Sequence, residues 1–315
     1  MNPYWGANFF QFFPLFFSRL FKLLTGSLSW SQLASDEIQV FVLGLISIAA
    51  ALIGTLLVLK RMTMLANSLS HTILLGIVVA YLLLSAAGGG NLELNFRVLV
   101  LAALVTGIVT TVLTQLLHHV FKLQEDASIG LVFTALFALG IVLVTLYTRN
   151  AHIGLEIVMG NADALHLNDL KVSLGVALTN VFFIVLFFKE WKLVCFDQGL
   201  ATSLGFRPSL FNYLLMLLTS ATAISAFRAV GVLLFLAFLV GLPLTARLIT
   251  NNFGKCLLWA AGIGVVCSLV AVALSRHFLS VYHAPLSTSG LVVTIIGLVF
   301  FMTLGLMGIR KKVII

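Results

Sequence analysis

Residues 60–84, KRMTMLANSLSHTILLGIVVAYLLL, place two basic residues directly before an apolar run about as long as a bilayer is thick. About 20 consecutive apolar residues cross the hydrocarbon as a helix, so this stretch predicts a membrane span. A histidine inside hydrocarbon is costly unless it lines a cavity or a transport path. The stretch therefore makes His71 a functional candidate.

The composition of the whole chain extends this prediction. Of 315 residues, 61% are hydrophobic and 9% are charged, against roughly a quarter charged in a soluble domain. Apolar runs satisfy their own backbone in lipid as helices, and these runs do not alternate as barrel strands do. We expect an all-α, polytopic membrane protein with eight or nine spans, of which 232–244 is the weakest. The predicted spans are 38–59, 68–85, 98–117, 128–147, 172–188, 210–226, 232–244, 257–274 and 291–307.

The net charge of +8 does not indicate nucleic-acid binding, because the basic residues lie at the ends of apolar runs and form no single patch. Loops placed alternately on two sides give eleven Lys and Arg against seven, if the run before residue 38 is counted as a span. The positive-inside rule then places the carboxyl terminus in the cytoplasm of a cell whose inner (plasma) membrane holds the protein. The eleven are Lys60, Arg61, Lys122, Lys189, Lys192, Arg207, Arg247, Lys255, Arg310, Lys311 and Lys312.

The amino-terminal run 9–24, FFQFFPLFFSRLFKLL, is aromatic, interrupted by Pro14 and short for a span. Amphipathic aromatic and basic residues favour the headgroup boundary. We expect residues 1–37 to form an interfacial anchor and residues 38–312 to form one membrane domain. Within that domain, small residues predict close helix packing at Gly44, Gly54, Gly130, Gly140, Gly262 and Gly264.

Asn67 and His71 are four residues apart and share one helix face. An amide oxygen and an imidazole nitrogen there could contact a passing zinc, manganese or iron ion. The alternative is a polar pair that is hydrogen-bonded to a neighbouring helix.

Other ionisable residues give weaker signals. His118 and His119 are expected on a solvated helix end, and Cys195, Cys256 and Cys267 as small apolar residues without a CxxC pair. Two interpretations of the outer-loop residues remain equally open. They could transfer metal or contact a partner, or they could have no functional role. These residues are His152, Glu156, Asp163, His166, Asp169, His277 and His283.

The sequence contains no GxxxxGK[ST] phosphate-binding loop, and no HExxH or GxSxG motif lies in a span. These absences favour a transporter subunit without its own ATPase site. If ATP drives it, a separate subunit must supply the ATPase.

Five motifs in order resemble the membrane permeases of bacterial ABC importers for zinc, manganese and iron, the ZnuB/MntB/TroC type. They begin with KRMTMLANSLSHTILLG, EDASIGLVFTALFALG and GLEIVMGNADALHLNDL, and continue with KLVCFDQGLATSLGF and AVGVLLFLAFLVGLPLTARL. The resemblance implies a type II ABC importer permease fold and no permanently bound cofactor, with manganese, zinc or iron as the transported ion.

The same resemblance assigns roles to particular residues. It implies that His71 faces the translocation path, and that a cytoplasmic loop couples to the ATPase through Phe196, Asp197, Ala201, Leu204 and Gly205. It further implies that the chain lies in a lipid bilayer and has three protein partners: the ATPase, a second permease subunit in a homo- or heterodimer, and an extracytoplasmic metal-binding protein. Asn67 stands where the family usually has aspartate, and Tyr282-His283-Ala284-Pro285 replaces Tyr-Asp-x-Pro.

Two other classes of function remain open from the sequence. A secondary transporter driven by protons or sodium would need acids within its spans, and the acids here lie near span ends or in loops. A structural or regulatory membrane subunit would use His71 for packing alone.

Overall fold

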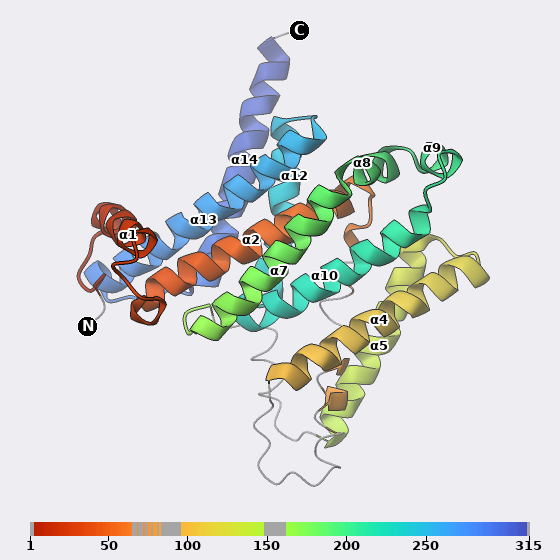
Figure 1. Cartoon of the computed structure of the whole chain (residues 1–315), viewed down its shortest axis with the longest axis horizontal. Helices are drawn as coiled ribbons and strands as arrows, with labels where there is room; N and C mark the ends of the chain where they lie inside the picture. The colour runs from red at the N-terminus through yellow and green to blue at the C-terminus, as the bar shows by residue number, and fades with distance from the viewer. Residues whose placement is uncertain are drawn as a thin grey trace.

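The computed structural model describes residues 3–64, 96–147 and 162–313, together with isolated positions between 68 and 82. All regular structure in these ranges is helical (Figure 1). The elements are α1 (Phe9–Leu24), η1 (Trp30–Gln32), α2 (Ser35–Leu59), α4 (Phe96–Val120), α5 (Glu125–Tyr147), α7 (Leu167–Leu186), α8 (Phe188–Phe196), α9 (Gln198–Ser203), α10 (Pro208–Val230), α11 (Val232–Leu236), η2 (Ala237–Gly241), α12 (Leu242–Ile249), α13 (Phe253–Tyr282) and α14 (Thr288–Val313).

The predicted spans correspond to helices throughout the described ranges. Seven helical stretches are long and apolar enough to cross a membrane, and α4 adds a shorter apolar stretch, Val105–His118. Of the predicted span 68–85, the structure describes only isolated positions, and these are helical. The all-α polytopic class is confirmed, and the helix number agrees with the eight or nine expected. Helix α2 begins before its apolar run because Asp36 and Glu37 occupy its first turn, where the helix dipole favours negative charge.

Helix α2 is the most buried span and packs between α13 and α7. Gly54 permits its closest approach to η2, because an added Cβ would lie 2.7 Å from the carbonyl carbon of Leu239. Gly264 permits a similarly close approach of α13 to α2, because a Cβ added at Gly264 would lie 2.9 Å from the Cβ of Ser47. Small residues thus set the helix spacing in the centre of the bundle.

Only part of the glycine prediction holds. Gly140 also lies close to a neighbour, because a Cβ added there would be 3.3 Å from the backbone nitrogen of Leu75. An added Cβ would meet no described atom within 4 Å at Gly130 or Gly262, and only one, at 4.0 Å, at Gly44. The prediction of tight packing is wrong for these three, because no described atom would be closer to the added Cβ than ordinary van der Waals contact.

The weakest predicted span is one continuous helix, Val232–Ile249, with a π-helical segment in its middle. Gly231, with φ +79°, separates α10 from α11, and the π-helical η2 separates α11 from α12. The span extends past its predicted end at residue 244 to Ile249, with Pro243 near the start of α12.

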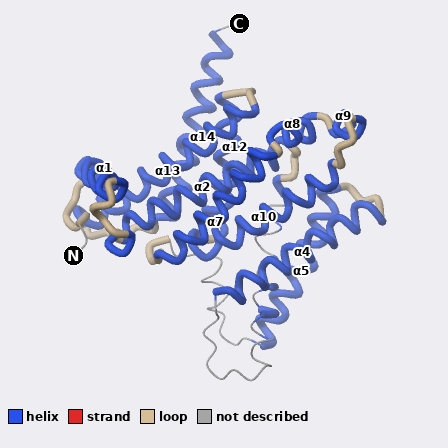
Figure 2. The backbone as a smooth tube through the Cα atoms, viewed as in Figure 1, coloured by secondary structure: helices blue, strands red, loops and turns tan. Residues whose placement is uncertain are grey.

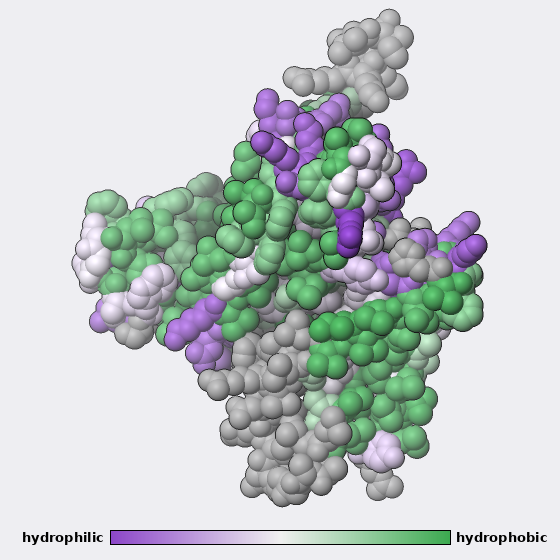
Figure 3. Space-filling view, turned by 45° about the vertical axis from the view of Figure 1, so that its right-hand side comes forward, coloured by the Kyte–Doolittle hydropathy of each residue, from purple (hydrophilic) through white to green (hydrophobic). Residues whose placement is uncertain are grey.

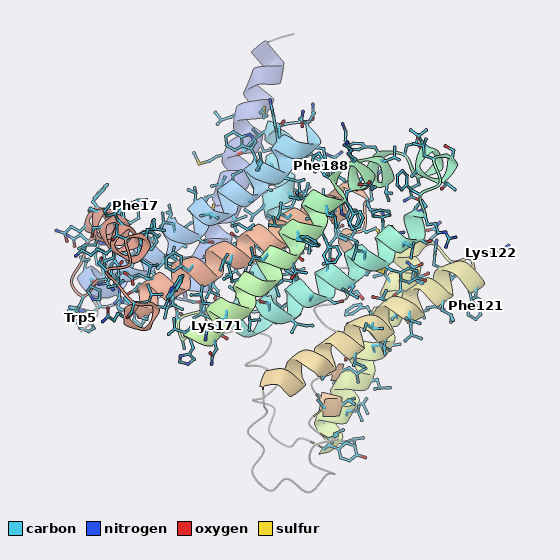
Figure 4. The ribbon with its side chains drawn as sticks, in the orientation of Figure 1. Trp5, Phe17, Phe121, Lys122, Lys171 and Phe188 are labelled. Carbon is cyan, nitrogen blue, oxygen red and sulfur yellow. The ribbon has the colours of Figure 1, made fainter. Side chains whose placement is uncertain are left out.

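The bundle has two chemically different ends. In the described part of the chain, short loops at these ends join most of the successive helices (Figure 2). Helices α8 and α9 lie at one end with the α4–α5 and α12–α13 turns, and α1 lies at the other (Figure 1). Hydrophobic residues cover broad areas between the ends, and hydrophilic side chains gather near the top of the view (Figure 3). We call the α8 end the basic end; its exposed cations include Arg61, Lys122, Lys189, Lys192, Arg207, Arg247 and Lys255. Lys122 and Lys171 mark opposite ends in Figure 4.

Candidate functional site

Helix α8 is fixed to two spans by a wholly buried tryptophan. The Trp191 ring lies 5.1 Å from the Phe211 ring of α10 in an edge-to-face arrangement. Its indole N–H donates to the Phe183 carbonyl of α7 over 3.4 Å. Val194 follows on the same helix face and is also fully buried. Because one face of α8 is held by both α7 and α10, a force applied to α8 is transmitted to two membrane helices.

Asp197 sets the turn between α8 and α9. Its backbone is extended, and its carboxylate accepts a hydrogen bond from the Leu200 N–H over 2.9 Å. Aspartate is a favoured residue at a helix amino terminus because it satisfies a free backbone donor there. The side chain of Ala201, in the middle of α9, is completely buried, so this short helix is packed down as well as capped.

Gly205 ends α9. Its φ of +86° is in the left-handed region, which glycine adopts without the cost that a Cβ imposes. Its N–H donates to the Thr202 carbonyl, and the Phe206 N–H donates to the Ala201 carbonyl, both over 3.0 Å. This pair of bonds is a Schellman motif, which fixes the exit of the chain toward α10.

Together α8 and α9 present an apolar surface with basic residues at its edge. Phe196 is 61% exposed and Leu204 is 60% exposed. We call the patch the α8–α9 surface; it consists of Phe196, Leu200, Leu204 and Phe206, with Lys189, Lys192 and Arg207 exposed beside it. Exposed apolar residues on a rigidly held element, rimmed by polar ones, are typical of a protein-binding site.

Cys195 on α8 is mostly buried. Burial raises the pKa of its thiol to about 11, so the thiol is neutral near pH 7. A neutral thiol is a poor metal ligand, in agreement with the interpretation of this cysteine as a small apolar residue.

The two predicted metal contacts, Asn67 and His71, lie outside the described residues. In the described part of the chain, no three His, Cys, Asp or Glu residues are grouped so that they could hold a metal ion.

The described outer-loop carboxylates have structural partners. Asp169 is buried at the start of α7 and accepts the His166 N–H over 2.9 Å. Asp163 accepts hydrogen bonds from Thr288 and, over 3.3 Å, from Gln39. These bonds hold the loop before α7 against α2 and the start of α14. His152 and Glu156 of the same loop lie outside the described residues.

Two described histidines, His118 and His277, have backbone partners, and a third, His283, caps a helix. His118 Nδ1 is 2.9 Å from the Leu123 carbonyl oxygen at the end of α4. His277 Nδ1 accepts the Phe9 N–H over 3.3 Å, and His283 ends α13 with φ +51°. Each position supports local structure.

Sequence reasoning missed a buried ion pair at the end opposite the basic end. Arg276 of α13 binds the carboxylate of Asp36 in α2, and beside the pair is a cavity of about 390 Å³. Its polar lining is Ser35, Asp36, Gln39, Asp163, Ser275, Arg276 and Ser287. The available signal was a charged residue directly beside each of two predicted spans, Asp36 before 38–59 and Arg276 after 257–274.

Residues 38–307 match the ABC 3 transport family. The match covers most of the chain, and the chain therefore belongs to this family of multi-pass membrane transport proteins. Its described part contains the membrane-spanning helices expected of such a subunit.

Named relatives extend the comparison. The chain is 42% identical, over its full length and 98% of the relative, to a "probable metal transport system membrane protein" of Chlamydia muridarum. It is 36% identical, over 70% of this chain and 76% of the relative, to the manganese transport system membrane protein MntD of Bacillus subtilis. The fold resembles that of PsaBC from Streptococcus pneumoniae in complex with Fab, with a TM-score of 0.70 and 21% identity over 87% of this chain and 92% of that one.

Proposed function

We propose that this chain is the membrane permease subunit of an ATP-driven importer of divalent metal ions: manganese, zinc or ferrous iron. The family match over residues 38–307 carries the proposal, and relatives named as metal or manganese transport proteins support the choice of cargo. In this role the chain performs no bond chemistry. It provides a polar path that binds a metal ion weakly enough to release it.

The α8–α9 surface is the proposed contact with the cytoplasmic ATPase. Phe196 and Leu204 supply apolar contacts, while Asp197 and Gly205 hold α9 in a fixed orientation. Because Trp191 joins α8 to α7 and α10, movement of the ATPase would be passed to these spans. The coupling role proposed for the loop thus has a mechanical route into the membrane.

His71 is the proposed metal contact on the transport path, with Asn67 one helical turn earlier. Neutral imidazole suits zinc, manganese and iron, whereas an amide oxygen is a weaker ligand than a carboxylate. A second permease subunit, identical or related, would complete the path. An extracytoplasmic binding protein would deliver the ion to the end opposite the basic end.

The basic end is proposed to face the cytoplasm of a cell whose inner membrane holds the protein, as the positive-inside rule requires. The exposed cations of the α4–α5 turn, the α8–α9 surface and the α12–α13 turn all lie at this end. The ATPase, which hydrolyses cytoplasmic ATP, then meets the α8–α9 surface on the same side.

A substitution at Leu204 tests the proposed contact with the ATPase. Leu204→Asp places a charge in the middle of the apolar surface and should reduce the ATPase recovered with the purified permease by about tenfold, which corresponds to about 1.4 kcal/mol. Leu204→Met retains the apolar contact and serves as the matched control. Equal recovery of ATPase with both variants, at equal amounts of folded permease, would exclude this surface as the contact.

A substitution at His71 tests the proposed path. His71→Ala should lower the initial rate of ATP-driven metal uptake while the complex still assembles. Normal uptake combined with poor assembly would instead indicate a packing role for this histidine.

A further inference from the structure

Helix α1 lies across one end of the bundle. Figure 1 shows it nearly end-on at the left, whereas α2 and α13 run across the picture. It precedes the family match, which begins at residue 38, and it is not among the helices apolar and long enough to cross a membrane. The helix runs through Pro14 without a break, although the sequence predicted an interruption there.

Hydrogen bonds fix α1 at the level where the spans end. Buried Glu37, in the first turn of α2, accepts hydrogen bonds from the Tyr4 hydroxyl over 2.8 Å and from the Arg19 guanidinium. The Phe9 N–H donates to His277, near the end of α13. Burial raises the pKa of the Tyr4 phenol, and the hydrogen bond to Glu37 raises it further.

The residues of α1 divide into three faces at about 100° per residue. The face against the bundle carries the buried Phe12 and Phe16, and Phe16 contacts Phe41 of α2 with ring centroids 6.0 Å apart. A second face, about 60° wide, consists of Phe10, Phe17, Phe21 and Leu24, all exposed, with Phe10 at 83%. A third face is exposed and mainly polar, with Gln11, Ser18 and Lys22.

We propose that α1 lies in the membrane interface at the end opposite the basic end, with Phe10, Phe17, Phe21 and Leu24 inserted among the lipid acyl chains. The occupant of this apolar face is a phospholipid bilayer, because α1 crosses the direction of the spans at the level of their ends (Figure 1), and its apolar face is exposed as are many apolar side chains of the spans. Its separate polar face is then directed to water. Trp5, 79% exposed, and Phe17 both project away from the bundle (Figure 4), and aromatic side chains favour the headgroup boundary.

A charge argument supports the same occupant. One of the two basic residues of α1, Arg19, is turned inward and bound to Glu37, which raises the pKa of its guanidinium. The exposed cation Lys22 belongs to the polar face, where it can reach lipid phosphates. An amphipathic helix of this kind buries its apolar face about 5–10 Å into the headgroup and acyl boundary.

Spin labels on the full-length chain in phospholipid nanodiscs test this proposal. With the three native cysteines replaced, single cysteines are placed at Phe17 and Phe21 on the aromatic face, and at Gln11 and Ser18 on the polar face. Accessibility to oxygen and to a water-soluble nickel chelate then gives the depth of each label. We expect labels 17 and 21 to collide with oxygen at about 5–10 Å depth, and labels 11 and 18 to collide with the nickel chelate.

Two results would overturn the proposal. Equal nickel accessibility at all four sites would show that α1 is surrounded by water. Protection of labels 17 and 21 from both reagents would show that protein, such as a second permease subunit, covers the aromatic face. Neither result depends on transport, so the test is independent of the proposed function.

Discussion

The guanidinium of Arg276 in α13 binds the carboxylate of Asp36 in the first turn of α2, with Nε 3.0 Å from Oδ1 and Nη2 in contact with Oδ2. Both side chains are buried, 240 residues apart in the sequence. A planar guanidinium and a carboxylate form two parallel hydrogen bonds, which fix orientation as well as distance. The pair therefore sets how the ends of α2 and α13 meet opposite the basic end.

Breaking this pair from one side should be strongly destabilising. Asp36→Ala leaves the buried Arg276 charge without this carboxylate and should cost about 3–5 kcal/mol. Replacing both partners, Asp36→Leu with Arg276→Met, should cost less because neither charge of the pair is then left buried without its partner. Unfolding of the purified variants in detergent measures both losses. A double variant less stable than Asp36→Ala would contradict the importance of the unpaired charge.

Gly54 and Gly44 provide a matched pair of substitutions in α2. Gly54→Ala forces a methyl group against the Leu239 carbonyl, and such overpacking typically costs about 1–3 kcal/mol. Among the described residues, the new methyl group of Gly44→Ala would meet only Val265, at 4.0 Å, and alanine is the better helix former. We expect a lower melting temperature for the first variant and an unchanged or higher one for the second. Equal stabilities would contradict the close packing of α2 on η2.

Gly205 and Gly199 provide a second pair, within the α8–α9 loop. Gly205→Ala puts a Cβ at φ +86° and should cost about 1–2 kcal/mol, which loosens the end of α9. In the part of the chain that the structure describes, the new methyl group of Gly199→Ala would meet only the Asp197 carboxylate, at 3.4 Å. The ratio of metal transported to ATP hydrolysed should fall in the first variant and stay near the parent value in the second. An unaltered ratio in both would argue against a coupling role for this turn.

Because the Tyr4 hydroxyl binds Glu37, we expect α1 to be released from the end of the bundle at alkaline pH. Because burial and Glu37 raise the phenol pKa above its ordinary 10.0, neutral Tyr4 stabilises the docked helix fully below pH 10. This contribution falls as the pH rises beyond that value, when a phenolate would form beside the Glu37 carboxylate. The mobility of a spin label at position 17 should increase above pH 10 in the parent and show no such tyrosine-dependent step in Tyr4→Phe. The same step in both proteins would contradict this assignment.

Local features of this chain could be predicted from its sequence. Apolar runs located the described spans because backbone hydrogen bonding in lipid leaves a helix as the only solution for a single segment. The chain turn at Asp197 and Gly205 follows from residues with well-defined local preferences, a capping carboxylate and a glycine that tolerates positive φ.

Long-range relations could not be predicted. The sequence does not show which glycines face a neighbouring helix, so Gly54 is packed while Gly130 is open. Nor does it indicate that Asp36 meets Arg276, or that Asp169 binds the His166 backbone. Such pairs depend on helix rotation and tertiary packing, and no sequence period encodes these.

Metal uptake into proteoliposomes tests the central claim most directly. The permease is reconstituted with its ATPase and binding protein around an enclosed metal-sensitive dye, and uptake of Mn²⁺ or Zn²⁺ is followed with ATP, without ATP, and under a proton or sodium gradient alone. We predict uptake only when both ATP and the ATPase are present. Uptake by the permease alone, driven by an ion gradient, would contradict the account and identify a secondary transporter.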